Sequence, residues 1–213
     1  MEKDLSDYRK VYKQNELLES NIPDHPIQLF QTWFYEIEKF DSHEANAMTL
    51  STVGKDNFPR GRVVLLKKYS HEGFMFFTNY DSEKGRDIAE NSNVCLSFFW
   101  PVMERQVIIK GVAERVDKNI SENYFHSRPD GSKLGAIISS QSSVIVDRNV
   151  LENGLKELEE KFKNKDIPMP ENWGGYIVKP ISVEFWQGRP NRLHDRIRYT
   201  IDGFDWKIER LAP

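Results

Sequence analysis

Apolar residues recur along the chain at two spacings, which divide it into helical and extended segments. From residue 24 to about residue 41 they return every three or four positions, through Phe30, Trp33 and Ile37, which predicts an amphipathic helix. From Ala47 they form alternating or continuous β-branched and aromatic runs bounded by glycine, asparagine and aspartate, which predicts strands. The predicted strands are 47–53, 62–69, 74–78, 93–100, 106–116, 175–187, 192–201 and 205–211, and the later helices are 82–91, 119–127, 132–139 and 147–164.

Short turns separate most successive strands of this pattern, which favours antiparallel pairing. Asp202-Gly203, for example, is a hairpin-type turn between the last two strands. A meander of this size usually closes into a barrel, which leaves no unpaired edge strand. We therefore predict an α+β fold, an antiparallel β-barrel with peripheral helices. We expect one domain over residues 21–213, preceded over residues 1–20 by a charged, mobile arm of loose helical character.

Composition excludes several classes of protein. The 213 residues carry a net charge of −3, whereas a general nucleic-acid binder is usually basic, so we expect no nucleic-acid partner. No apolar run approaches the ~18 residues of a membrane span, and the charged start of the chain does not resemble a secretory signal. A single cysteine, Cys95, allows neither an internal disulfide framework nor a cysteine metal cluster. We therefore expect a soluble, cytoplasmic protein without a membrane partner.

The motifs of several enzyme classes are missing. The sequence contains no Gly-x-x-x-x-Gly-Lys phosphate loop, no Gly-x-Gly-x-x-Gly fingerprint, no His-Glu-x-x-His metal motif and no Gly-x-Ser-x-Gly elbow. Its five histidines are scattered, so we expect no metal site. If the protein is an enzyme, its chemistry is expected to come from a bound organic cofactor.

The segment Arg192-Leu193-His194-Asp195-Arg196 is a candidate binding surface. On a strand, Arg192, His194 and Arg196 share one face, and two guanidiniums beside an imidazole suit an anionic, planar ligand. The alternative is a solvated strand face whose charges pair with surface acids.

Two further groups resemble phosphate pockets. Tyr124 and Arg128 are four residues apart on one helix face, and Ser132 begins the next helix, so a hydroxyl, a guanidinium and a helix N-terminus come together. Thr78 and Lys84 flank a turn into a helix, where a hydroxyl, an ammonium and backbone N–H groups meet. Ordinary helix capping is the alternative in both cases.

Arg62 and Lys67 bracket an apolar strand. At about 3.3 Å per residue they lie roughly 16 Å apart, and a regular strand points them to opposite faces. Two anionic groups, or the ends of one long ligand, could contact both, and the alternative is two strand-end charges that reach water. The aromatic–glycine segments 173–175 and 185–188 could wall a flat ring or serve as core and turn. Gln141-Ser142 offers amide and hydroxyl groups, or is a polar linker.

Together and in this order, these segments resemble the pyridoxamine/pyridoxine 5′-phosphate oxidase family, FMN enzymes that make pyridoxal 5′-phosphate. The matching stretches are 62–67, 77–79, 104–107, 124–129, 141–143, 173–175, 184–188, 192–196 and 209–213. With Arg9 and Tyr12 included, the resemblance extends from about residue 9 to the last residue. The resemblance implies a homodimeric split β-barrel with FMN at the subunit interface.

The resemblance also implies a reaction, that of a pyridoxal 5′-phosphate synthase in the last step of vitamin B6 cofactor synthesis. Hydride passes from C4′ of pyridoxamine 5′-phosphate or pyridoxine 5′-phosphate to flavin N5, the amine releases ammonia, and dioxygen is reduced to hydrogen peroxide. One alternative is another FMN split-barrel enzyme, such as a nicotinamide-dependent flavin reductase, which leaves Tyr124, Arg128, Arg192 and His194 unexplained. The other is a non-catalytic protein that binds flavin or pyridoxal phosphate.

The family pattern implies roles for individual residues. FMN contacts are implied for Arg62, Val63, Val64, Leu65, Leu66, Lys67, Phe77, Thr78, Lys84, Gln106, Gln141, Ser142, Trp186 and Arg196. Substrate contacts are implied for Arg9, Tyr12, Lys67, Tyr124, Arg128, Ser132, Arg192 and His194, with Arg192 and His194 as catalytic residues against the pyridine ring and Arg9 and Tyr12 in a mobile segment that can cover the site. Phe77 stands where family members often have tyrosine, and Glu83 where many have a basic residue, so Lys84 and Arg62 are expected to bind more of the FMN phosphate.

Overall fold

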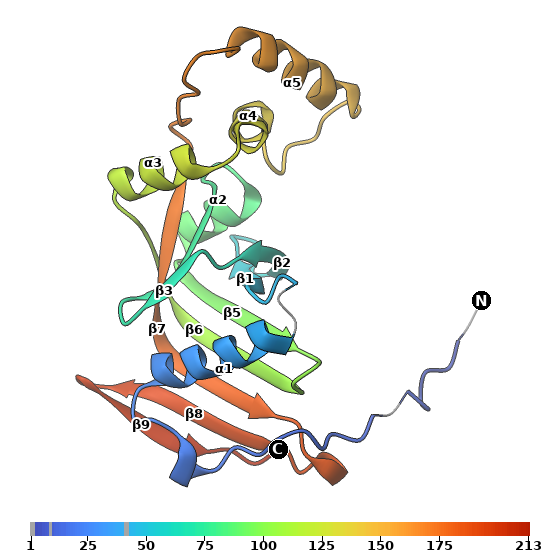
Figure 1. The fold of residues 1–213 in the computed structure, drawn as a ribbon, viewed down its shortest axis with the longest axis vertical. Helices are drawn as coiled ribbons and strands as arrows, with labels where there is room; N and C mark the ends of the chain where they lie inside the picture. Colours follow the sequence, from blue (N-terminus) through green and yellow to red (C-terminus); the bar gives the residue numbers. More distant parts are fainter. Residues whose placement is uncertain (1–2, 9, 41–42) are drawn as a thin grey trace. The chain divides into compact units, whose positions relative to one another are not determined.

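The structure is a computed structural model that describes residues 3–8, 10–40 and 43–213. Its helices are the 3₁₀ turn η1 (Glu19–Asn21), α1 (Pro26–Phe40), α2 (Glu83–Glu90), α3 (Lys118–Ser127), α4 (Asp130–Ile138), α5 (Asn149–Lys161) and the 3₁₀ turn η2 (Pro190–Arg192). Its strands are β1 (Ala47–Val53), β2 (Pro59–Leu65), β3 (Lys68–Ser70), β4 (Gly73–Asn79), β5 (Asn93–Trp100), β6 (Arg105–Arg115), β7 (Trp173–Gln187), β8 (Asp195–Asp202) and β9 (Asp205–Arg210) (Figure 1). No described helix is long and apolar enough to cross a membrane.

The described strands form one sheet in the order β2-β1-β5-β6-β7-β4-β3, with β8 paired to β7 and β9 paired to β8. This order is not a simple meander, because β4 pairs with β7 rather than with β5. β7 pairs antiparallel with β4 early in its length, where Gly174 faces Thr78, and antiparallel with β8 later, where Trp186 faces Arg196. The predicted hairpin joins β8 to β9 through Gly203, whose φ of 64° suits glycine.

The chain folds as two compact units, each built from separate segments. The first unit contains the described residues of Met1–Thr49 together with Cys95–Lys110 and Pro180–Pro213. The second unit contains Leu50–Val94 and Gly111–Lys179. Strands β1, β5, β6 and β7 therefore contribute residues to both units.

The first unit is organised around α1. The apolar stripe predicted for this helix is buried, including Phe30, Trp33 and Ile37. Phe30 lies edge-on to Phe98, and Trp33 edge-on to Phe185, each with 5.2 Å between ring centroids. Such aromatic pairs add about 0.5–1.5 kcal/mol beyond the burial of their area. The helical spacing of the sequence thus accounts for how α1 packs.

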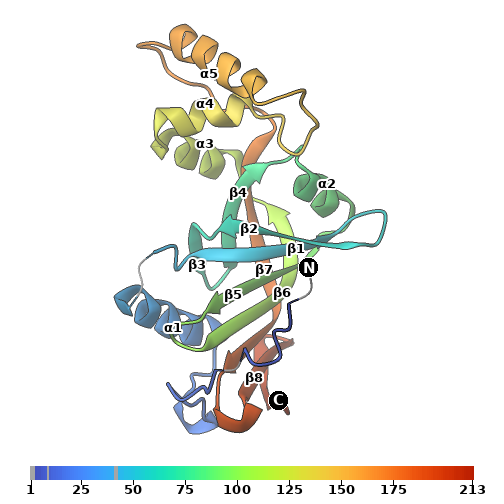
Figure 2. The ribbon, with the colours of Figure 1, turned by 90° about the vertical axis from the view of Figure 1, so that its right-hand side faces the viewer.

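The second unit carries α3, α4 and α5, which Figures 1 and 2 both show gathered beside one another. Phe125 of α3, Leu134 of α4 and Trp173 at the start of β7 belong to one buried cluster. Phe77 of β4 and Leu155 of α5 pack against this cluster. The shared apolar cluster therefore holds α3 and α4 next to β4. These three elements carry Tyr124, Ser132 and Thr78, which are predicted to bind phosphate.

Two predicted strands are interrupted or shorter. The strand predicted over 62–69 ends as β2 at Leu65 and resumes as β3, because β2 pairs with β1 whereas β3 pairs with β4 at the other end of the sheet order. The strand predicted from Arg192 begins only at Asp195, because Pro190 has no N–H to donate and Asn191 and Arg192 have φ values of 57° and 61°. The prediction that Arg192, His194 and Arg196 alternate on one strand face was therefore wrong.

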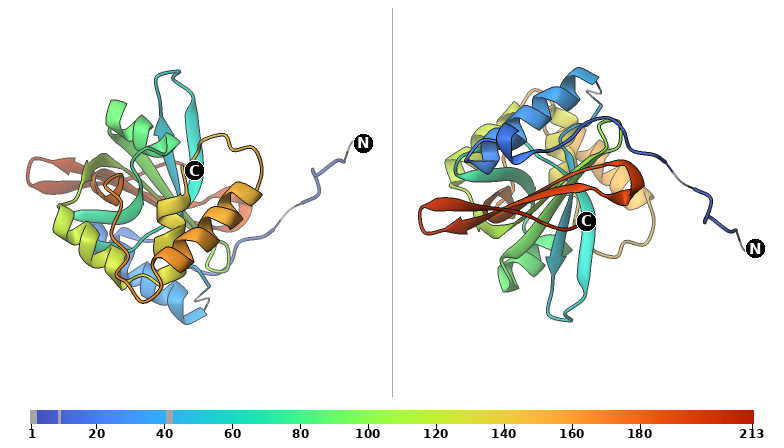
Figure 3. Two further views of the ribbon diagram at one scale, coloured as in Figure 1. Left: turned by 90° about the horizontal axis from the view of Figure 1, so that it is seen from above. Right: turned by 90° about the horizontal axis from the view of Figure 1, so that it is seen from below.

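Over residues 3–8 and 10–18 the arm contains no helix: it has one turn, where the Tyr8 N–H donates to the Leu5 carbonyl at 3.0 Å, and is otherwise irregular, so its predicted helical character was wrong (Figure 3). Its backbone N–H groups donate to carboxylates of the first unit, from Lys13 and Gln14 to Glu104 and from Leu17 to Asp195. These bonds satisfy donors that a helix would have satisfied internally. The remaining predicted helices and strands are present, with their ends shifted by a few residues.

Candidate active site

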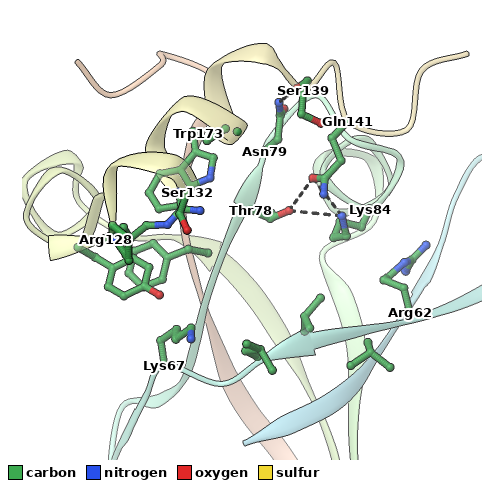
Figure 4. A pocket seen from close by; sticks show the side chains of 18 residues that line it. Arg62, Lys67, Thr78, Asn79, Lys84, Arg128, Ser132, Ser139, Gln141 and Trp173 are labelled. Atoms are coloured by element: carbon green, nitrogen blue, oxygen red, sulfur yellow. Dashed lines mark hydrogen bonds between the residues drawn. The ribbon is translucent and has the colours of Figure 1, made fainter. Parts of the chain in front are cut away.

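A cavity of about 850 Å³ opens in the second unit beside β2, β4 and the helices α2 to α4 (Figure 4). Its lining includes a large share of the residues predicted to bind FMN or substrate, namely Arg62, Val63, Val64, Leu65, Lys67, Phe77, Thr78, Lys84, Tyr124, Arg128, Ser132 and Gln141. Four of these side chains are cationic, and no carboxylate of the described residues lines the cavity. Figure 4 shows Arg62 and Lys84 on one side, and Lys67, Arg128 and Ser132 on the other. The cavity therefore presents two separated cation groups to anionic ligands.

Lys84 is the most buried of the four cations, with 7% of its surface exposed. Its Nζ lies 3.4 Å from Thr78 Oγ1, 3.3 Å from Ser82 Oγ and 3.3 Å from Gln141 Oε1, and Thr78 Oγ1 donates to Gln141 Oε1 at 3.2 Å. Burial lowers the pKa of the ammonium, and the neighbouring Arg62 guanidinium lowers it further. These hydrogen bonds go to neutral oxygens, so a bound anion would supply the missing counter-charge.

Arg62, on β2, is held by neighbours on its own side of the cavity. Its Nη1 donates to Thr52 Oγ1 at 2.6 Å and to the Leu50 carbonyl at 3.3 Å, and Thr52 in turn donates to Asp87 Oδ2 at 2.7 Å. Its Nη2 lies 3.5 Å from Glu83 Oε2 and 3.8 Å from Asp87 Oδ2. Glu83 thus pairs with Arg62 instead of contributing a cation of its own.

Arg128 follows the end of α3 and carries an unused donor. Its guanidinium lies 4.8 Å from the centre of the Trp173 ring, and its Nη1 is buried with no hydrogen-bond partner among the described residues. Burial lowers the pKa of this guanidinium, with the nearby Tyr124 opposing the shift. A buried, unpaired guanidinium N–H is costly, by about 1–3 kcal/mol, unless a ligand accepts from it. This donor points to a site for an anionic group.

Aromatic rings form one wall of the same cavity. Phe77 and Tyr124 stack with 4.0 Å between ring centroids, and Trp173 stacks on Phe77 at 5.6 Å. Ser132 lies inside the first turn of α4, which begins at Asp130, so the prediction that Ser132 starts this helix was wrong. Ser132 still lines the cavity together with Tyr124, as predicted.

A second set of predicted residues lies in the first unit, around His194. Trp186 lies 4.7 Å from His194 between ring centroids, and Tyr12 lies edge-on to both rings at 5.7 Å. The backbone N–H of Arg189 donates to His194 Nδ1 at 3.1 Å, which assigns the proton of the neutral ring to Nε2. Burial lowers the pKa of His194, and the adjacent Arg192 lowers it further.

Two other predicted FMN contacts of the first unit have protein partners. Arg196 donates through Nε to Glu184 Oε1 at 2.8 Å and through Nη1 to the Ala212 carbonyl at 2.8 Å. The bond with Glu184 raises the pKa of Arg196. Gln106 donates through Nε2 to Ser97 Oγ at 3.2 Å. Both side chains are held in one orientation, and their roles toward FMN stay predictions.

The remaining predicted residues lie elsewhere, and some lining residues were not predicted. Leu66 is buried, Ser142 is exposed with a φ of 71°, neither lines the cavity, and Arg9 lies outside the described residues. Cavity-lining residues without a predicted role are Asn79, Pro129, Gly135, Ala136, Ser139 and Trp173. The aromatic–glycine segment 173–175 gave a signal for Trp173, and Asn79 and Pro129 belong to stretches that resemble the family. Gly135, Ala136 and Ser139 are small and gave no signal.

Comparison with protein families gives two adjacent matches. Residues 36–162 match the family described as pyridoxamine 5′-phosphate oxidase. Residues 173–213 match the pyridoxine 5′-phosphate oxidase C-terminal dimerisation region. The two matches together cover most of the chain and include both sets of residues described above, with the exception of Tyr12.

Individual relatives agree with these matches. The chain is 65% identical to a pyridoxine/pyridoxamine 5′-phosphate oxidase of Flavobacterium johnsoniae over 211 residues, which cover 98% of this chain and 99% of that protein. It is 47% identical, over 99% of its length, to a chloroplastic oxidase of the same name from Arabidopsis thaliana, of which the match covers 41%.

Solved structures give the fold. PhzG from Burkholderia lata 383, in complex with tetrahydrophenazine-1-carboxylic acid, superposes with a TM-score of 0.88 at 28% identity, over 94% of this chain and all of that one. A pyridoxamine 5′-phosphate oxidase-related, FMN-binding protein from Nostoc punctiforme superposes with a TM-score of 0.70 at 15% identity, over 89% of this chain and 98% of that one. The predicted fold class, an antiparallel split β-barrel with peripheral helices, is confirmed.

Proposed function

This chain belongs to the pyridoxamine 5′-phosphate oxidase family, and from that premise we propose how its residues convert pyridoxamine 5′-phosphate and pyridoxine 5′-phosphate to pyridoxal 5′-phosphate with FMN. The observation that carries the proposal is the cavity with four cations and no lining carboxylate. Both FMN and the substrate carry a phosphate, so two anionic groups must be bound at once. The cations stand in two groups on opposite sides of the cavity, which matches that requirement (Figure 4).

The first cation group suits the FMN phosphate. Arg62 and Lys84 supply charge, and the Thr78 hydroxyl and the Gln141 amide lie within hydrogen-bond distance of one another or of Lys84. The exposed Val63 side chain and the half-buried Val64 and Leu65, all on β2, offer apolar surface beside them. A bound FMN would supply the redox chemistry: a hydride acceptor for substrate C4′ and the reduction of dioxygen to hydrogen peroxide.

The second cation group suits the substrate phosphate. The unpaired Nη1 of Arg128 is the donor with the clearest need of an acceptor, and Lys67, Tyr124 and Ser132 line the same part of the cavity. A phosphate bound there holds the substrate in place in the ground state and in the transition state alike. These residues therefore act in binding and orientation rather than in proton transfer.

Arg192 and His194 are proposed to contact the pyridine ring and its C4′ substituent. His194 contacts Trp186 and accepts at Nδ1 from the Arg189 N–H, so the proton of the neutral ring is on Nε2 and is proposed to be donated toward a ring substituent. The chain contains the family's C-terminal dimerisation region, and residues 192 and 194 belong to it. We propose that a homodimer binds FMN at its interface, with Gln106, Trp186 and Arg196 as further contacts. We also propose a cytoplasmic location.

The test is product stoichiometry with the purified, FMN-loaded protein in air. With pyridoxine 5′-phosphate we expect one hydrogen peroxide for each pyridoxal 5′-phosphate, and with pyridoxamine 5′-phosphate one ammonia in addition. Flavin that turns over only when a nicotinamide is added would identify a reductase instead. Flavin that stays bound without any product would identify a binding protein.

A further inference from the structure

Glu104 is a buried carboxylate in the first unit that the reaction described above does not use. It lies in the turn between β5 and β6, where its φ of 56° is in the left-handed region, and its side chain is only 2% exposed. Its backbone carbonyl accepts from the Gly188 N–H at 2.8 Å and from Gln187 Nε2 at 3.2 Å. The main chain of Glu104 is thereby fixed to the end of β7, next to Trp186.

The side chain of Glu104 binds the N-terminal arm. Its Oε2 accepts from the backbone N–H of Lys13 at 2.8 Å and of Gln14 at 3.1 Å, and its Oε1 lies 3.1 Å from Lys10 Nζ. All three donors belong to the arm, and charge-assisted bonds of this kind are roughly twice as strong as neutral ones. Two of them are backbone donors, so they fix the path of the arm whatever side chains it carries.

Gly188 provides the room for this path. A Cβ atom at this position would come within 2.8 Å of Tyr12 Cγ and 3.1 Å of Glu104 Cβ. The arm therefore lies on a position that has no side chain, beside the carboxylate that binds it. This close approach is independent of the hydrogen bonds and indicates the same position for the arm. We call this position, on Glu104 and Gly188, the seat of the arm.

The bound arm brings Tyr12 next to Trp186, a proposed FMN contact, and His194, a proposed substrate contact. Tyr12 lies edge-on to Trp186 and to His194, with 5.7 Å between ring centroids in both pairs. We propose that Glu104 is a positioning residue: it holds residues 10–14 so that Tyr12 closes over Trp186 and His194. Its importance for the reaction rests on the proposed function, whereas the seating of the arm does not.

The proposal predicts a separation of kinetic constants. The resemblance to the family implies that Tyr12 contacts the bound substrate before and during the reaction, so its loss from the site should weaken both states equally. For Glu104→Ala, which removes all three contacts with the arm, we expect the KM for pyridoxine 5′-phosphate to rise about tenfold as Tyr12 leaves the site, with kcat changed less than about twofold. Glu104→Gln keeps an acceptor for the backbone donors but loses the charge, so its KM should be intermediate.

The seat itself is tested without turnover, by the rate at which trypsin cleaves after Lys10 in the substrate-free protein. We expect faster cleavage in Glu104→Ala and in Gln14→Pro, which deletes one backbone donor from the exposed arm and leaves the body of the protein intact. Asn15→Pro is the matched control, because the backbone N–H of Asn15 makes no hydrogen bond to Glu104, and it should be cleaved at the wild-type rate. Wild-type cleavage rates in both Glu104→Ala and Gln14→Pro would overturn the seat.

Two further results decide what the seat does. Faster cleavage with an unchanged KM in both variants would refute the positioning role. A wild-type protein that forms no pyridoxal 5′-phosphate would instead refute the proposed function, and the proteolysis would still report on the seat. If Glu104→Ala fails to fold, Gln14→Pro alone carries the test.

Discussion

Replacing Arg128 by methionine separates the binding of substrate from the stability of the protein. Arg128 presents a buried Nη1 without a hydrogen-bond partner among the described residues, and its guanidinium lies 4.8 Å from the Trp173 ring centre. Methionine keeps an unbranched side chain against Trp173 and removes the charge and the donors. In the proposed substrate complex the change deletes at least one charge-assisted bond to phosphate, worth about 1.5–3 kcal/mol. At about 1.4 kcal/mol per factor of ten, the KM should rise roughly 10- to 150-fold.

The same substitution should not destabilise the substrate-free protein. Removing an unpaired buried donor relieves about 1–3 kcal/mol, whereas the lost cation–π contact with Trp173 costs about 0.5–2 kcal/mol. The free energy of unfolding should therefore stay within about 1 kcal/mol of wild type, or rise, in urea denaturation. The control is Arg148→Met at the exposed position just before α5, where the arginine side chain pairs with Glu152 at 2.6 Å. Its KM and its free energy of unfolding should both stay at the wild-type values. A KM within threefold of wild type, or a fall in kcat with no change in KM, would refute the role of Arg128 in phosphate binding.

Three other changes test other parts of the site. Lys84→Met should weaken the binding of FMN by at least about tenfold, measured by the fluorescence of released flavin. Lys55→Met at the surface is the control and should bind FMN as wild type does. Equal FMN binding in the two variants would count against the role of Lys84. Thr52→Val removes the hydroxyl that links Arg62 to Asp87 and should lower the free energy of unfolding by about 1–3 kcal/mol in urea, so a loss near zero would contradict this link. Burial lowers the pKa of His194 below its ordinary value of 6.5, so the ring in the folded protein stays neutral at pH values where the unfolded chain is already protonated. The contribution of the neutral ring to the free energy of unfolding is therefore lost as the pH falls below about 6.5. An NMR titration midpoint of His194 at or above 6.5 would disprove this shift.

Local patterns in the sequence were sufficient for the elements that build the site. The cap at Ser82 and the spacing of Thr78 and Lys84 predicted a turn into a helix, and the structure places Lys84 Nζ within 3.4 Å of both Thr78 and Ser82 oxygens. Tyr124 and Arg128 likewise line one cavity, as their spacing predicted. Such groups lie within a few residues of one another, where the geometry of one helix or turn decides their separation.

Predictions that assumed a continuous strand failed where the strand changes partner or stops. Arg62 and Lys67 were expected on opposite faces, yet both line one cavity, because β2 ends at Leu65 and Lys67 lies outside any strand. Arg192 precedes β8 for the same kind of reason, since the backbone at Asn191 is in the left-handed region. Pairing partners are set by residues far away in the sequence, so the strand pattern alone could not place these breaks.

The sequence pattern also could not predict contacts between segments that are far apart in the chain. Glu104 belongs to a segment that matched the family, but its carboxylate binds donors about 90 positions earlier in the chain. Nothing in the spacing of charges around Glu104 distinguishes it from a surface glutamate. Its burial becomes visible only when the arm is seen to lie against it.

We propose that this chain oxidises a phosphorylated pyridine through a flavin whose phosphate is bound in the four-cation cavity. The most direct measurement is an anaerobic titration of the FMN-loaded protein with pyridoxine 5′-phosphate, followed by the visible absorbance of the flavin. We expect the absorbance to bleach, pyridoxal 5′-phosphate to appear in an amount equal to the flavin reduced, and the colour to return when air is admitted. Absorbance that persists in the presence of excess pyridoxine 5′-phosphate would contradict it.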